Sequence, residues 1–130
     1  MSKRSYYPGS GDVKIIIGDE EVTLRPTLEA GLALSRQAGG FRLAMQKIVD
    51  LDLDMIASVI RLGVGREEAR RLKNLDRMIY ENGLLDSQGE VVVRCIEYLA
   101  NLSRGGRPAD DEGAEVAADA DPTKTQPPAS

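Results

Sequence analysis

Apolar residues recur at the spacing of an α-helix through most of residues 27–104, and this periodicity constrains the fold more than any other feature of the sequence. In residues 41–49 the apolar side chains fall at i, i+3, i+4, i+7 and i+8, which places them on one helix face. Residues 53–62 repeat that spacing and add a second apolar face. Because a helix that is apolar on two sides must be covered on both, we expect residues 53–62 to form the central, most buried helix.

The segment before the helices has the pattern of a β-hairpin. In residues 13–25 two runs rich in β-branched residues flank Gly18-Asp19, a pair that suits a two-residue type II′ turn. Ile15 and Ile17 would share the strand face that covers the core. The predicted fold class is therefore α+β and mostly α, with an N-terminal β-hairpin followed by a compact bundle of about four to five short helices.

The first helix is predicted for residues 28–37, with Thr27 as its N-cap. Leu28 and Leu32 fall on one stripe of this helix, and Leu34 lies beside them. The helices together, residues 27–104, complete the single domain that begins with the hairpin.

The segments on either side of the predicted domain, residues 13–104, have a different composition. Residues 1–12 show no periodic pattern, so we expect a flexible lead-in. Residues 105–130 contain six acidic residues and only two basic ones, so the whole formal charge of −4 lies in this segment. It has too few large apolar residues to offset a backbone ordering cost of about 1–2 kcal/mol per residue. We therefore predict a disordered acidic C-terminal tail.

The composition also excludes several kinds of catalytic and metal site. The chain has no histidine and one cysteine, Cys95. Ser-His-Asp and Cys-His catalysis require an imidazole, and protein zinc sites are built mainly from histidine or several cysteines. The sequence thus predicts a protein that is not an enzyme, that holds no metal or cofactor, and whose Cys95 is a buried, inert thiol.

Targeting signals are absent from the sequence as given. No apolar run approaches the roughly 18 residues that span a membrane, and the first residues lack the apolar stretch of a signal peptide. A single cysteine forms no intrachain disulfide. These features predict a cytoplasmic protein with no membrane partner.

Three carboxylates, Asp50, Asp52 and Asp54, alternate with leucines before the central helix. One interpretation makes them metal ligands or an acid–base pair. The other makes them a helix cap, because a carboxylate at a helix N-terminus accepts backbone N–H bonds and is favoured by the helix dipole. The second interpretation is preferred, since no glycine or distal glutamate completes a calcium-binding loop.

The basic residues form one cluster. Arg66, Arg70, Lys73 and Arg77 follow i, i+4, i+7 and i+11 spacing and would share one face of a continuous helix. Such an electrostatic patch suits a phosphate or an acidic protein partner. Acidic residues are interleaved with it and no aromatic residue lies beside it for base stacking. A solvated helix face is therefore favoured over nucleic-acid binding.

Two predicted helices, residues 53–62 and 91–102, have wider apolar faces than a small domain easily hides. This width indicates self-association as a homo-oligomer, capture of a helix from a partner, or simple burial by the hairpin and the other helices. The residues that we expect in the core or in a partner-binding surface, two roles that the sequence does not separate, are Leu53, Ile56, Ile60, Val92, Ile96 and Leu99.

The order of these patterns resembles that of a known protein family. A hairpin whose second strand runs through VTLRPT (22–27) leads into a Leu-Glu-Ala helix and a glycine break, then into LDLDMIASVIRLG (51–63). IYENG (79–83) and a final apolar helix follow. Over residues 13–104 this layout resembles the small tail proteins of gene transfer agents and related long-tailed phages, grouped with phage tail assembly chaperones. It departs from the family at Ser35-Arg36-Gln37, where an acidic residue is frequent, and in its longer acidic tail.

The resemblance implies a non-enzymatic role in building a phage-type tail in the cytoplasm of a bacterial host. Chaperones of this group are expected to keep the long, helical tape-measure protein soluble while tail tube subunits polymerise around it. The implied partners are the tape-measure protein, the tail tube protein, or both. Two alternatives remain open: a structural tail component associated with the tube, and a small helical regulatory module that binds nucleic acid through residues 66–77.

Overall fold

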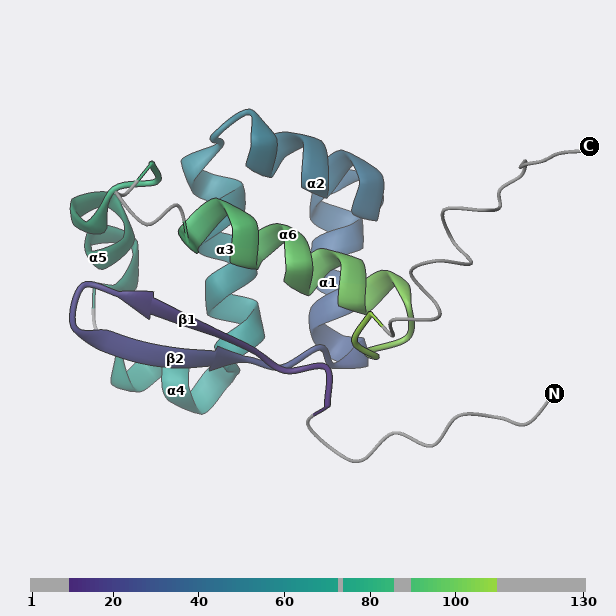
Figure 1. Ribbon diagram of the computed structural model, residues 1–130, viewed down its shortest axis with the longest axis horizontal. Coiled ribbons are helices and arrows are strands. Elements are labelled where there is room, and N and C mark those ends of the chain that lie inside the picture. Colours follow the sequence, from purple (N-terminus) through teal and green to yellow (C-terminus); the bar gives the residue numbers. More distant parts are fainter. Residues whose placement is uncertain (1–9, 73, 86–89, 110–130) are drawn as a thin grey trace, which may run out of the picture.

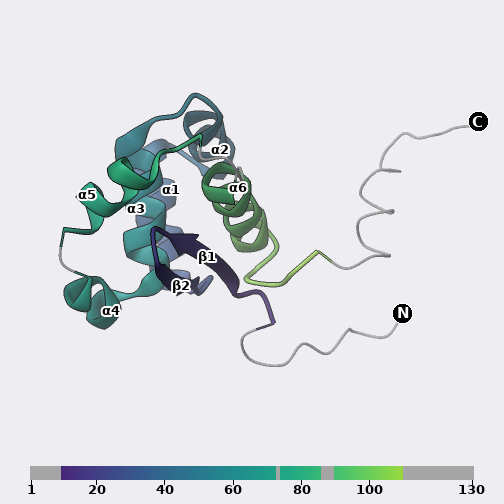
Figure 2. The ribbon, with the colours of Figure 1, turned by 60° about the vertical axis from the view of Figure 1, so that its left-hand side comes forward.

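The structure, a computed structural model, describes residues 10–72, 74–85 and 90–109 of the 130-residue chain. In this part of the chain a β-hairpin is followed by six helices (Figures 1 and 2). The elements are β1 (Val13–Ile17), β2 (Glu20–Leu24), α1 (Leu28–Ala38), α2 (Phe41–Val49), α3 (Leu53–Val64), α4 (Arg66–Arg71), α5 (Leu75–Asn82) and α6 (Glu90–Ser103). The predicted fold class is confirmed, and the helices exceed the expected four to five because two short ones, α4 and α5, form separately.

The hairpin has the predicted turn and the predicted orientation. Its strands pair antiparallel with Ile17 opposite Glu20, so Gly18 and Asp19 form a two-residue loop. Gly18 has a φ of 62°, the positive value that the first position of a type II′ turn requires. Ile15 and Ile17 are buried, whereas Ile16 between them is 54% exposed. One face of the hairpin therefore covers the core and the other faces solvent.

The core lies between the hairpin and the helices α1, α2, α3 and α6. Strand β2 packs along α3 and strand β1 packs along α6, while α1 and α2 cover the remaining side of α3 (Figure 1). Every residue from 55 to 60 in α3 is buried, which confirms that this helix is the central one. Asp52 caps it, because its carboxylate accepts a 3.0 Å hydrogen bond from the backbone N–H of Met55.

Helix α1 begins where the sequence predicts, and it buries the side that carries Leu34. The Thr27 hydroxyl accepts a 3.1 Å hydrogen bond from the Ala30 N–H, as an N-cap does. Ala30 and Leu34 point inward, together with Ala38 one turn further on. The predicted stripe of Leu28 and Leu32 remains exposed, because a helix with two apolar stripes buries the one that its neighbours can reach.

The domain extends further at both ends than residues 13–104. Gly11 is buried, and its carbonyl accepts a 2.9 Å hydrogen bond from the side-chain amide of Asn101. After α6 the chain turns back, and the Gly106 N–H donates to the Asn101 carbonyl at 2.8 Å. Asn101 thus joins both ends of the described chain. The remainder of the predicted lead-in, residues 1–9, and of the predicted tail, residues 110–130, lies outside the described residues.

We predict that Gly63→Ala destabilises the protein, since Gly63 lets β2 approach α3. A Cβ at Gly63 would lie 2.9 Å from the Leu24 Cβ and 3.3 Å from the Leu24 Cα, atoms that cannot swing aside. Overpacking of this kind typically costs about 1–3 kcal/mol, more than the helix propensity that alanine adds near a helix end. Urea denaturation measures the loss in the free energy of unfolding.

Gly31→Ala is the matched control for this change. A Cβ there would meet Leu102 at 3.4 Å and Phe41 at 3.5 Å, which are ordinary van der Waals contacts. We expect this variant to gain up to about 1 kcal/mol from helix propensity. Equal stabilities for the two variants would show that the contact between Gly63 and Leu24 does not limit the packing of the hairpin.

Candidate binding sites

The six apolar residues expected in the core or in a partner-binding surface divide between the two. Ile56, Ile60 and Leu99 have no exposed surface and belong to the core, so they offer nothing to a partner. Val92 and Ile96 are partly buried and pack against the core cluster. Leu53 alone among the six is classed as exposed, at 37%. The wide apolar faces of α3 and α6 are therefore used mainly within the domain.

Two leucines of α1, Leu28 and Leu32, are more exposed than Leu53. Leu28 is 79% exposed and Leu32 is 43% exposed, and they lie one helical turn apart on the face that turns away from the core. They border a groove of about 320 Å³ between α1 and the end of α6. The side chains and backbone that line it include Leu28, Gly31, Leu32, Ser35, Phe41 and Leu102.

This surface, called the α1 groove below, is shaped by the residue at its base. Gly31 carries no side chain, and the nearest atoms to its missing Cβ belong to Leu102 and Phe41 on the opposite wall. The sequence signal for the groove was the stripe of Leu28 and Leu32. Periodicity alone does not tell which of two apolar stripes is exposed, so this surface was not predicted as a binding site.

The predicted basic stripe is not one helix face. Asn74 has a left-handed backbone with a φ of 60°, so the helix ends after Arg71 and a new one starts at Leu75. Arg66 and Arg70 lie on α4, whereas Arg77 lies on α5 and pairs with Glu81 at 3.2 Å. Lys73 lies outside the described residues. The spacing rule failed because it assumed a continuous helix through the break.

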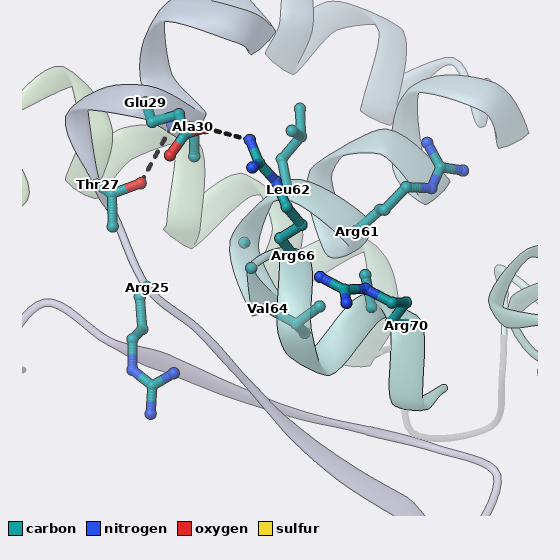
Figure 3. Close-up of a pocket in the computed structure, with 12 residues that line it drawn as sticks. Arg25, Thr27, Glu29, Ala30, Arg61, Leu62, Val64, Arg66 and Arg70 are labelled. Carbon is teal, nitrogen blue, oxygen red and sulfur yellow. Dashed lines mark hydrogen bonds and ion pairs between the residues drawn. The ribbon is translucent and has the colours of Figure 1, made fainter. Parts of the chain in front are cut away.

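Two of these arginines instead join a different basic site. A pocket of about 510 Å³ lies between the end of β2, the start of α1, the end of α3 and α4 (Figure 3). Four arginines contribute to its lining, namely Arg25, Arg61, Arg66 and Arg70, with one carboxylate, Glu29. The sequence did not predict this arginine pocket. Arg25 is about forty residues away from Arg66 along the chain, and Arg61 lies on α3 rather than on α4.

The arginines of the pocket differ in how they are paired. In Figure 3, Arg66 reaches across to Glu29 at 3.3 Å, and both side chains are about four-fifths exposed. Arg61 points away from Arg66 and Arg70 in the same view and pairs with Asp76 of α5 at 2.7 Å. Arg70 has no hydrogen-bond or ion-pair partner among the described residues. Exposed pairs such as that of Arg66 contribute only about 0–1 kcal/mol, so its cation remains exchangeable.

A neighbouring arginine outside the pocket lining is more firmly held. Arg71 donates hydrogen bonds to Glu68 on its own helix and, at 3.2 Å, to Glu20 of β2. The hydrogen bond from Arg71 lowers the pKa of Glu68 below its ordinary value. These contacts tie α4 to the hairpin and so hold the outer wall of the arginine pocket in place.

The reactive side chains have structural roles. Burial raises the pKa of the Cys95 thiol to about 12, so it carries almost no thiolate near neutral pH. Burial, reinforced by the Asp12 carboxylate, raises the pKa of Tyr98, whose hydroxyl donates to the Arg25 carbonyl at 2.7 Å. In residues 10–72, 74–85 and 90–109, no three His, Cys, Asp or Glu side chains gather closely enough to hold a metal ion.

Comparison of the chain with protein-family models, with curated proteins and with solved structures found no match. Among the described helices, none combines the length and the apolar character that crossing a bilayer requires. The class of molecule defined by the fold is thus a small α+β domain in which a hairpin packs on a helical core, and the surface of its described part includes the α1 groove and the arginine pocket.

We predict that Cys95 resists thiol reagents in the native protein. Its side chain has no exposed surface and its pKa is raised to about 12 by burial. Reaction with a chromogenic disulfide at mildly alkaline pH should therefore be at least about a hundredfold slower in buffer than in denaturant. Comparable rates in the two solutions would mean that α6 opens readily and that the thiol is available for chemistry.

Proposed function

We propose that this protein is a non-enzymatic tail assembly chaperone of a phage or gene transfer agent, and that the α1 groove binds a helix of its partner. The observation that carries the proposal is the exposed second apolar face of α1, with Leu28 at 79% and Leu32 at 43% exposure. These leucines contribute little to the core of the domain. Exposed apolar side chains of this kind favour binding of another protein chain, as a chaperone that covers an apolar surface of its partner requires.

The shape of the groove suits an amphipathic helix. In helix-in-groove recognition, apolar side chains of the bound helix at i, i+3, i+4 and i+7 enter a hydrophobic groove. Leu28, Leu32 and Ser35 line the α1 side of the groove. Phe41 and Leu102 line the side that faces Gly31. The tape-measure protein, which the resemblance implies as a long helical chain, is the partner we propose first, with the tail tube protein second.

The nucleic-acid alternative has less support. Of its predicted residues, Arg66 and Arg70 lie on α4 and Arg77 lies on α5, a separate helix. Arg66 and Arg77 are each paired with a carboxylate. The pocket that Arg66 and Arg70 do line contains no aromatic side chain on which a base could stack. Carboxylates of a protein partner are a better match for it.

The proposal is tested by co-expressing the full chain with the tape-measure protein and, separately, with the tail tube protein encoded near its gene. We expect a soluble complex on affinity capture and size-exclusion chromatography. Leu28→Glu should weaken capture at least about tenfold, because burying a carboxylate in an apolar contact costs more than the roughly 1.4 kcal/mol that a tenfold loss requires. The fold should tolerate the change, since Leu28 is exposed and an acidic residue in a first helical turn is favourable.

The matched control is Val93→Glu, which places the same charge on an exposed apolar position of α6, 58% exposed and outside the groove lining. It should capture the partner as the unchanged chain does. If neither tail protein is captured by the unchanged chain, or if Val93→Glu and Leu28→Glu weaken capture equally, the groove is not the binding site. A salt-sensitive shift of duplex DNA without tail-protein capture would favour the regulatory alternative.

A second variant separates binding from stability. Gly31→Ala adds one methyl group at the base of the α1 groove, in ordinary contact with Leu102 and Phe41. We expect weaker partner capture from a protein that is as stable as the unchanged chain or more so, because the groove becomes shallower while the helix gains propensity. Unchanged capture by this variant would place the partner elsewhere on the surface.

A further inference from the structure

The arginine pocket combines positive charge with apolar walls. Arg25, Arg66 and Arg70 stand around a lining that includes Leu62 and Val64, and Glu29 is the single carboxylate in it. Such a mixture does not suit a small, fully hydrated anion, which needs a cage of buried donors. It suits a peptide segment in which carboxylates alternate with small apolar side chains.

The cations of the pocket are free enough to accept new partners. Arg70 has no ion-pair partner in the described part of the chain, and its guanidinium extends over the pocket in Figure 3. Arg25 lies 3.9 Å from Asp12, with 61% of its side chain exposed. Arg66 holds Glu29 only through an exposed contact. A segment that brings several carboxylates therefore gains charge-assisted hydrogen bonds without breaking a buried pair.

The chain itself carries such a segment close by. After α6 the backbone returns to the start of α1, where a Cβ on Gly106 would lie 2.9 Å from the Pro26 carbonyl. Pro26 is the neighbour of Arg25 in the pocket lining. The sequence continues through DDEGAEVAADAD (110–121), with six carboxylates and one valine. Asp110 follows Gly106 by four residues, a reach of up to roughly 14 Å.

We propose that the arginine pocket binds the acidic segment 110–121 of the same chain. The charges are complementary, because that part of the sequence holds all the acidic residues after Gly105, while Arg25, Arg66 and Arg70 line the pocket in addition to Arg61, which pairs with Asp76. Tethering raises the effective concentration of the segment to the millimolar range, so a weak contact suffices. Val116 supplies the apolar side chain for the wall of Leu62 and Val64. The proposal concerns a surface other than the α1 groove and does not depend on the proposed function.

The test is a backbone amide NMR spectrum of the isotope-labelled full chain, with residues 110–121 as reporters. Arg70→Gln removes the unpaired cation, and Arg77→Gln is the matched control, an exposed arginine of α5 outside the pocket. We expect the amide signals of residues 110–116 to move in Arg70→Gln and to stay in place in Arg77→Gln. About 1 M NaCl, with a Debye length of about 3 Å, should move the signals of the unchanged chain in the same direction.

A second full-chain variant tests the other side of the contact. Asp110→Asn, Asp111→Asn and Glu112→Gln together remove three charges and should shift the amides of Gly63 and Gly65, which line the pocket. The shifts should be the same at low and high protein concentration. Signals of the acidic segment that are identical in the unchanged chain and in Arg70→Gln would overturn the proposal. So would shifts that grow with protein concentration, because the occupant would then come from a second copy.

Discussion

The structure depends on the joint between the end of the hairpin and the central helix. At Arg25 the backbone N–H donates to the Gly63 carbonyl at 2.8 Å, and the backbone carbonyl accepts from the Tyr98 hydroxyl at 2.7 Å. The backbone N–H of Arg25 is thus bonded to α3, and its backbone carbonyl is bonded to α6. The contact is possible because Gly63 has no Cβ to hold Leu24 away. Because both hydrogen bonds join the hairpin to a helix, they favour a single arrangement of hairpin and helices.

The same joint determines where both candidate binding sites lie. Pro26 and Thr27 follow Arg25 directly and start α1, so the direction in which α1 leaves the hairpin is set by the bonds of Arg25. Thr27 lies in the lining of the α1 groove and of the arginine pocket. The two sites are therefore neighbours on either side of the first turn of α1. A segment bound in the arginine pocket would lie close to any partner helix in the α1 groove.

Periodicity and capping predict most of the fold because they are local. The turn at Gly18, the cap at Thr27 and the buried α3 follow from residues close in sequence, and all are confirmed. Two other features depend on tertiary structure, and the sequence did not decide them. The stripe of Leu28 and Leu32 competes with a second apolar stripe, and only packing selects between them. The arginine pocket is formed by two stretches of the chain, residues 25–30 and 61–70, so no spacing rule anticipates it.

Position 31 shows how the α1 groove differs from the rest of the domain. Glycine inside a helix costs about 1 kcal/mol relative to alanine, and at Gly63 close packing against Leu24 explains that cost. At Gly31 close packing does not explain the choice of glycine, because a Cβ would lie at ordinary van der Waals distances from its neighbours. Next to Gly31 two leucines are exposed without benefit to the core. A glycine inside a helix and exposed leucines beside it both oppose stability, and neither improves the packing of the core. Such a combination is typical of a functional surface rather than of a folding requirement.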